Sequence, residues 1–408
     1  MKLLFLNSSD NLLFVLTNFI FQIYFARVLS YDDFGSMNII YTIYIFIQMI
    51  MMSFYHEIFV VESRIHTIDD TISLFLGILK HIIFITSVMC ITIAIAMLAI
   101  FSYLSLFDYI IISISILLLV SFQFSRRIFH FTNSHKEGTL SSMLFLLSFM
   151  IILFICLYID LIFTPSISFL ILGLSTVPSL IFIIYYTNKF NNKKNIYELS
   201  GIIFIKRGLV VFVSNLSYWI SSNIYVFLIP IIGTIAMLGE FRILLLLVLP
   251  FNHIIASLNT IILTKIKIYY ENKKNNLSRR LVYLWIVFIC ISGTIYGSIV
   301  FFFFNDLLLY IFDKSIILLP IEIFLLSIIP MLSVMNLPSN MYLRVIKEQK
   351  LVAKSAIISL IMLIISILIL SIVDNFTSIT IIFISYVVFY FISAILSFIF
   401  FYTRINHE

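Results

Sequence analysis

Two arginines interrupt apolar stretches of this sequence and are its clearest candidates for chemistry. Arg27 ends the first apolar run, in FQIYFARVLSYDDFG, and Arg242 lies near the start of another, in AMLGEFRILLLL. A guanidinium is a planar fork of hydrogen-bond donors that fits the oxygens of a phosphate. We therefore predict that both arginines bind a phosphate-bearing substrate. Snorkelling to lipid headgroups, or pairing with local carboxylates, is the open alternative.

Polar side chains form a stripe on each of two apolar runs. In the run 9–29, amides recur at spacings of seven and four residues, which places them on one helical face, and the run 208–229 has a similar stripe. Such stripes in hydrocarbon must face protein or water. They either form hydrogen bonds between helices or line a cavity. The predicted cavity residues are Asn18, Gln22, Asn215, Trp219 and Ser222.

Other reactive side chains are scattered. The candidates for proton relay or ion coupling are Glu57, Glu322 and His253, which could equally be satisfied interior groups. The three cysteines, Cys90, Cys156 and Cys290, lie inside apolar runs and are expected to be core residues without disulfides. We find no phosphate-binding loop and no zinc motif. The sequence therefore predicts no catalytic residue, metal or cofactor.

The composition determines the class of protein that positions these residues. The chain has 408 residues, of which 62% are hydrophobic and 11% charged, and its mean hydropathy is +1.17. Apolar stretches of about twenty residues without strand-like alternation predict an all-α polytopic membrane protein with about twelve spans. The expected spans are 9–29, 36–60, 72–101, 109–129, 140–160, 167–187, 208–229, 240–262, 281–304, 315–337, 353–373 and 379–402.

Positive charge is distributed unevenly between the two ends of these spans. All but Arg27, Arg242 and Lys314 of the 25 lysines and arginines fall on one side. The positive-inside rule then predicts that both termini are cytoplasmic. Because this placement explains the net charge of +6, the charge does not indicate a nucleic-acid partner.

A polar segment divides the chain into two sets of about six spans. We predict an N-terminal six-helix bundle at 1–190, a cytoplasmic linker at 191–206 and a C-terminal six-helix bundle at 207–408, around a central cavity. The second span opens with DDFGSMNII and the eighth with GEFRILLLL, so each half has an acidic residue and a phenylalanine at the same place. This echo suggests an internal duplication.

The opening stretch resembles the start of the Wzx-type polysaccharide flippases of the multidrug/oligosaccharidyl-lipid/polysaccharide exporter superfamily. There an apolar first helix ends in an arginine-leucine segment, and a short acidic turn leads through Phe-Gly or Tyr-Gly into the second helix. The matching residues are Arg27, Leu29, Asp33, Phe34 and Gly35. Gly239-Glu240-Phe241 departs from the usual glycine-tyrosine at the eighth span.

This resemblance implies a bacterial inner-membrane flippase, and no enzyme. It would move undecaprenyl-diphosphate-linked oligosaccharide, for O-antigen or capsule, to the outer leaflet by alternating access. The implied partners are the lipid-linked oligosaccharide, membrane lipid, and polysaccharide polymerase and chain-length machinery. A cation-coupled small-molecule antiporter of the same superfamily is the nearest alternative. An O-antigen polymerase is disfavoured because no outer loop is large.

Overall fold

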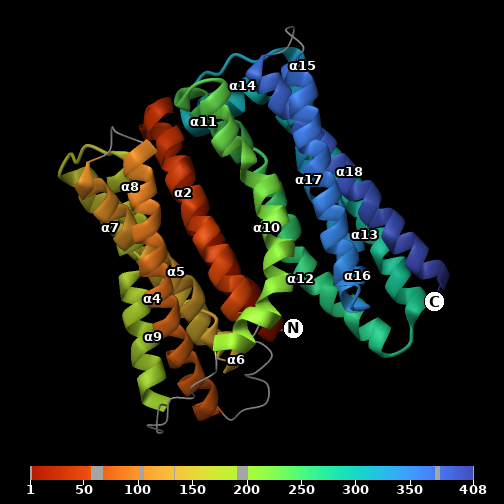
Figure 1. The fold of residues 1–408 in the computed structure, drawn as a ribbon, viewed down its shortest axis with the longest axis horizontal. Coiled ribbons are helices and arrows are strands. Elements are labelled where there is room, and N and C mark those ends of the chain that lie inside the picture. Colours follow the sequence, from red (N-terminus) through yellow and green to blue (C-terminus); the bar gives the residue numbers. More distant parts are fainter. Residues whose placement is uncertain are drawn as a thin grey trace. The chain divides into compact units, whose positions relative to one another are not determined.

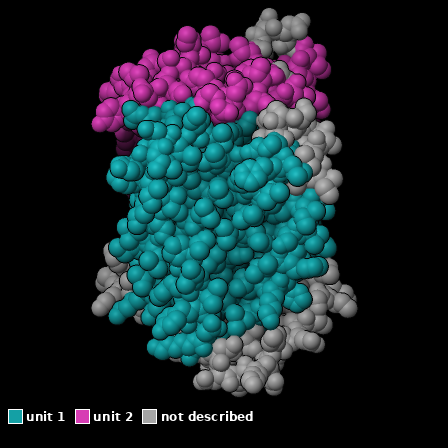
Figure 2. All heavy atoms as spheres, turned by 90° about the vertical axis from the view of Figure 1, so that its left-hand side faces the viewer, with its two compact units in different colours: residues 1–29, 36–215 teal, residues 30–35, 216–408 magenta. Residues whose placement is uncertain are grey.

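The structure is a computed structural model that describes residues 2–56, 68–100, 105–132, 134–190, 201–372 and 377–407. Within these ranges the regular elements are all helices (Figure 1), which confirms the predicted all-α class. The chain forms two compact units, coloured in Figure 2: residues 1–29 with 36–215 (unit 1), and residues 30–35 with 216–408 (unit 2).

Unit 1 is built around the packing of α1 along α7, and of α5 against α4 and α8. Buried rings, among them Phe21, Phe122 and Phe149, fill the space between these helices. The elements that contribute to unit 1 are α1 (Lys2–Val28), α2 (Tyr31–Met51) with the π-helical turn η1 (Met52–His56), α4 (Ile68–Ile100), α5 (Leu106–Ser125), α6 (Ile128–Phe131), α7 (His135–Tyr158), α8 (Pro165–Leu174), α9 (Val177–Phe190) and the first part of α10 (Gly201–Ile232).

Unit 2 is built around the pairs α17 with α18, α13 with α15, and α12 with α13. One core cluster joins Phe251, Trp285 and Val334, from three different helices. The further elements of unit 2 are α11 (Ile235–Leu246), α12 (Leu249–Glu271), α13 (Asn275–Phe302), α14 (Phe304–Leu307), the π-helical turn η3 (Leu308–Phe312), α15 (Pro320–Met335), α16 (Leu337–Val345), α17 (Gln349–Ser371) and α18 (Ser378–His407).

Ten helices of the described residues are long and apolar enough to cross a membrane, or eleven if the bent pair α11 and α12 is one span. The sequence predicts about twelve. In the α10 region, only the shorter apolar stretch Ser222–Ile231 is found. The helix pairs α8–α9, α11–α12 and α15–α16 each break just before Pro178, Pro250 or Pro338. Proline has no N–H to pair with the carbonyl four residues earlier and clashes with it.

Two helices contribute residues to both units. The first part of α10 packs in unit 1, where Gly208 lies against Phe54 and Asn215 Nδ2 donates a 2.9 Å hydrogen bond to Ser53 Oγ. The division at residues 215 and 216 therefore falls inside α10. Of the predicted linker, residues 191–200 lie outside the described residues, and 201–206 begin α10.

The first turn of α2 packs on α11 in unit 2 (Figure 1). A Cβ atom on Gly35 would overlap the carbonyl oxygen of Ile235, and one on Gly239 would overlap the carbonyl oxygen of Tyr31. The contact is reciprocal, since each helix contributes a glycine and a carbonyl four residues before it. The two stretches that echo each other in sequence thus meet backbone to backbone, as small residues allow in membranes.

Helix N-termini differ between the two ends of the spans. We call the end where lysines and arginines gather the basic side, and the other the acidic side. On the acidic side, side chains accept hydrogen bonds from backbone N–H groups at or beside the starts of α2, α5, α8, α11, α15 and α18; these side chains are Ser30, Ser105, Thr164, Thr234, Glu322 and Thr377. On the basic side, the starts of α7, α13 and α17 have no side-chain cap.

Replacing Gly297 with Ala should destabilise unit 2, although Ala is usually better than Gly inside a helix. Gly297 of α13 faces α15, and a Cβ atom there would overlap the carbonyl oxygen of Ser327. We expect a loss of about 1–3 kcal/mol, as for other overpacked sites, measured by thermal unfolding in detergent. Ser298→Ala, at the adjacent exposed position, is the control. Equal stability of both variants would show that α13 and α15 do not approach this closely.

Candidate functional site

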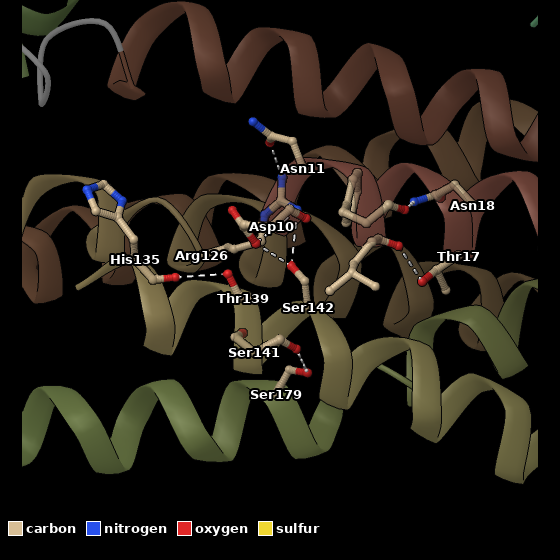
Figure 3. Close-up of polar contacts among 12 residues, drawn as sticks. Asp10, Asn11, Thr17, Asn18, Arg126, His135, Thr139, Ser141, Ser142 and Ser179 are labelled. Carbon is tan, nitrogen blue, oxygen red and sulfur yellow. Dashed lines mark hydrogen bonds and ion pairs between the residues drawn. The ribbon is translucent and has the colours of Figure 1, made fainter. Parts of the chain in front are cut away.

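An arginine buried near the basic side of unit 1 organises the charged groups there. Arg126 and Asp10 form an ion pair at 3.6 Å, and both side chains are at most 2% exposed. Arg126 also donates to Asn11 Oδ1 at 3.2 Å and to Ser142 Oγ at 3.3 Å. Ser142 in turn donates to the Asp10 carboxylate. Figure 3 shows Arg126 between Asp10 and Asn11, at the start of α1, and Ser142, from α7.

This cluster fixes α1 against the rest of unit 1. The Arg126 guanidinium lies 4.2 Å from the centroid of the Phe14 ring, an attractive cation–π distance. Hydrogen bonds to Asn11 and Ser142 satisfy donors that would otherwise be costly to bury. Sequence analysis missed this role, because Arg126 follows an apolar run and was counted among the basic-side charges. The signal that could have identified it is Asp10, an acidic residue at the basic end of the first span.

A pocket of about 290 Å³ lies beside this cluster in unit 1. Phe14 and Asn18 of α1 line one wall, and residues of α2, among them Tyr41, Tyr44 and Gln48, line the other. Asn18 Nδ2 donates to the Phe14 carbonyl at 2.9 Å, and the Tyr41 hydroxyl lies 3.5 Å from Asn18 Oδ1. The pocket therefore combines aromatic rings with amide and hydroxyl groups.

Arg242 lies inside unit 2, where it joins the other polar groups of α10 and α18. Its Nη1 donates a 2.9 Å hydrogen bond to the Tyr225 hydroxyl. Tyr225 is buried and stacks edge-on with Tyr386, whose hydroxyl donates to the Ser222 carbonyl at 3.1 Å. His253 of α12 is close enough to Arg242 to interact electrostatically. We call these five residues the arginine site.

The other predicted site residues are distributed over both units. Arg27 is exposed in the last turn of α1 in unit 1, whereas Gln22 is buried on the same helix. Asn215 bonds to Ser53, as described above. Trp219 is half-buried on α10 in unit 2, with its ring 6.2 Å from that of Phe227. Glu57 lies outside the described residues.

Glu322 has a structural task at the start of α15. One carboxylate oxygen accepts the backbone N–H of Leu319 at 2.8 Å, and the other accepts the hydroxyls of Thr377 and Thr380 at 2.8 and 2.5 Å. The side chain is only 3% exposed. Glu322 thus joins α15 to the start of α18, and the structure places it in the first turn of a helix rather than deep in a span.

Asp10 and Arg126 should be energetically coupled, so that removing both costs less stability than the sum of the two single changes. Asp10→Asn leaves the Arg126 charge buried without its counter-ion, and we expect a loss of about 3–5 kcal/mol. The Asp10→Asn, Arg126→Met double variant should lose less than the sum of the single variants in a thermal-unfolding cycle. Glu348→Gln, which breaks the exposed pair with Arg404, should cost under about 1 kcal/mol. Additive losses at Asp10 and Arg126 would contradict the coupling.

Comparisons with known proteins identify the fold. No protein-family model matches the sequence, and no curated protein matches it. Solved structures do: an inward-facing multidrug resistance MATE family transporter of the MOP superfamily superposes with a TM-score of 0.69 at 16% identity, over 97% of this chain and 95% of its own. An outward-facing structure of such a transporter gives 0.66 at 13% identity, over 100% and 95%.

A third solved structure is a MOP superfamily transporter from Pyrococcus furiosus, described as having a binding pocket of reverse polarity that suggests a different function. It gives a TM-score of 0.67 at 14% identity, over 99% of this chain and 95% of its own. These neighbours are transporters and not enzymes. The whole chain therefore has the fold of the MATE transporters of the MOP superfamily.

Proposed function

We propose that this chain is a flippase that moves a lipid-diphosphate-linked oligosaccharide across the bacterial inner membrane by alternating access. The transporter fold supports alternating access, and the Wzx-like stretch from Arg27 to Gly35 is consistent with the same superfamily. A hydrophilic glycan with its diphosphate cannot cross hydrocarbon unaided, because burying unpaired charges and hydroxyls is prohibitive. Two units with polar interiors could shelter the headgroup while the lipid tail stays in the bilayer.

The observation that carries the proposal is the arginine site of unit 2. Arg242 is half-buried, and its Nη1 donates to the Tyr225 hydroxyl, which holds one edge of the guanidinium. A guanidinium fork inside unit 2 is suited to the oxygens of a phosphate. Hydroxyl and amide groups of the unit 1 pocket would suit the glycan, which both donates and accepts hydrogen bonds.

A cation-coupled small-molecule antiporter is the second candidate, because the neighbours include multidrug resistance MATE transporters. Intramembrane carboxylates often mark the pathway of a coupling ion or proton. In the described residues, the two buried carboxylates are Asp10 and Glu322. Asp10 is paired with Arg126, and Glu322 accepts three hydrogen bonds, so both already hold structural partners. We therefore favour the flippase.

The orientation and partners belong to the same proposal. The lysine-rich basic side would face the cytoplasm, which places both termini there. The lipid-linked oligosaccharide and membrane lipid would be the direct partners, with polysaccharide polymerase and chain-length machinery acting on the product.

Deleting the gene should stop surface polysaccharide and leave lipid-linked repeat units on the cytoplasmic leaflet. The measurement is the accessibility of those units to a membrane-impermeant glycan-modifying reagent in spheroplasts, in a strain without a redundant flippase. Complementation with the intact gene is the control. Normal exposure of the units on the outer leaflet in the deletion strain would refute the flippase, and a gain of drug sensitivity alone would favour the antiporter.

Replacing Arg242 with Gln should lower transport at least tenfold, because it removes the charge while keeping hydrogen-bonding capacity. Tyr225→Phe removes only the neutral partner, so it should retain most transport. The amount of protein in the membrane is measured alongside, because a folding defect would lower both this amount and the transport rate. Full transport with Arg242→Gln would remove the arginine site from the substrate path. The same comparison with Arg27→Gln tests whether that exposed arginine contributes.

A further inference from the structure

A second polar cavity, of about 790 Å³, opens on the basic side of unit 2. It lies between the end of α12, the start of α13 and the end of α16. Four cations line it, Lys267, Lys273, Arg344 and Lys347, together with Glu271 and Tyr270. We call this cavity the basic pocket. Leu263 and Val345 also line it, so the pocket combines charged groups with an apolar flank.

Carboxylates near the basic pocket neutralise little of its charge. Glu271 lies 3.7 Å from Lys267, one turn earlier on the same helix. Glu348, which follows Lys347, forms a 2.8 Å ion pair with Arg404 of α18. Through Lys273, Arg344 and Lys347, positive side chains therefore outnumber the carboxylates of the pocket. The pocket is suited to an anion.

The backbone at two of these lysines is the independent observation. Lys273 and Lys347 have positive φ, 56° and 64°. Lys273 directly follows the C-cap of α12, and Lys347 directly follows the C-cap of α16. The closing hydrogen bonds are identical, from Lys274 N–H to the Tyr269 carbonyl and from Glu348 N–H to the Leu343 carbonyl, both 2.8 Å. Glycine is the usual residue at this position, because any Cβ is strained there.

The described residues with positive φ differ in type between the two sides of the protein: they are lysines on the basic side and aspartates on the acidic side. The other described non-glycine residues with positive φ are Asp160 and Asp313, and aspartate tolerates this conformation well. Lysine has no such tolerance. At both turns that face the basic pocket the chain thus carries a cation where glycine would suit the backbone better.

The start of α13 adds donors to the same pocket. Asn275, its first residue, lines the cavity, and no side chain caps this N-terminus. The N-terminal end of a helix carries a partial positive charge and favours anions such as phosphate.

We propose that the basic pocket holds the phosphate of an anionic phospholipid from the leaflet on the basic side. The lysines and Arg344 contact the phosphate oxygens, the N-terminus of α13 supplies further donors, and the acyl chains follow the apolar flank by Leu263 and Val345. Tyr270, which also lines the pocket, would then lie beside the headgroup, where tyrosines are enriched at membrane interfaces. Binding there ties the ends of α12 and α16 to the membrane surface. This does not depend on which substrate the protein transports.

The test is lipid binding by the full-length protein, measured by native mass spectrometry with phosphatidylglycerol and with phosphatidylcholine. We expect wild type to retain phosphatidylglycerol preferentially. The Lys273→Gly, Lys347→Gly double variant should bind it on the order of 25-fold more weakly, at about fivefold per lysine. Because glycine relieves both turns, this variant should unfold at a temperature no lower than that of wild type. Asp160→Gly with Asp313→Gly, the matching change to glycine at the two turns of the acidic side, should keep wild-type binding.

Three results would overturn the proposal. Equal retention of phosphatidylcholine by wild type would show that the pocket does not select an anion. Unchanged phosphatidylglycerol affinity in the double lysine variant would place the lipid elsewhere. Displacement of the lipid by an equal concentration of glycerol phosphate would assign the pocket to a soluble phosphate. Transport activity enters none of these readouts, so a failure of the flippase proposal leaves this test intact.

Discussion

Hydrocarbon offers no hydrogen-bond partner, and this constraint determines where polar groups lie in the protein. Side chains inside the spans bond to the carbonyl one turn earlier, as Ser53 does to Met49 at 2.8 Å. Side chains cap the starts of α2, α5, α8, α11, α15 and α18 on the acidic side, whereas the starts of α7, α13 and α17 on the basic side have no side-chain cap. Arg126 follows the same rule, since it donates hydrogen bonds to Asn11 and Ser142 and forms an ion pair with Asp10.

Much of the fold could be predicted from the sequence, because bilayer thickness and hydropathy together determine the spans. The all-α class followed from long apolar runs without alternation. The number of spans was less predictable where prolines divide helices, as at Pro250 between α11 and α12. The predicted division at the linker follows chain order, whereas the packing divides the chain inside α10, where Asn215 binds Ser53. Hydropathy carries no information on which neighbour a helix packs against.

The roles of charged residues were hardest to predict, because they depend on distant partners. Arg126 and Asp10 are more than a hundred residues apart, and one local window contains only one of them. Glu322 looked like an isolated carboxylate because its partners Thr377 and Thr380 belong to the last helix. Arg242 lies about two turns into α11, and its contact with Tyr225 of α10 depends on a packing that the sequence does not reveal.

The stretch that resembles the flippases has a physical explanation that does not involve a substrate. Ser30 and Asp33 cap α2 through mutual hydrogen bonds, Phe34 is fully buried, and Gly35 permits the backbone contact with α11. The capping of α2 and its crossing with α11 therefore account for the part of the stretch from Ser30 to Gly35. It follows that the part of the motif from Ser30 to Gly35 reports the fold, and that under the proposed function substrate selection belongs to other residues, such as those of the arginine site and the unit 1 pocket.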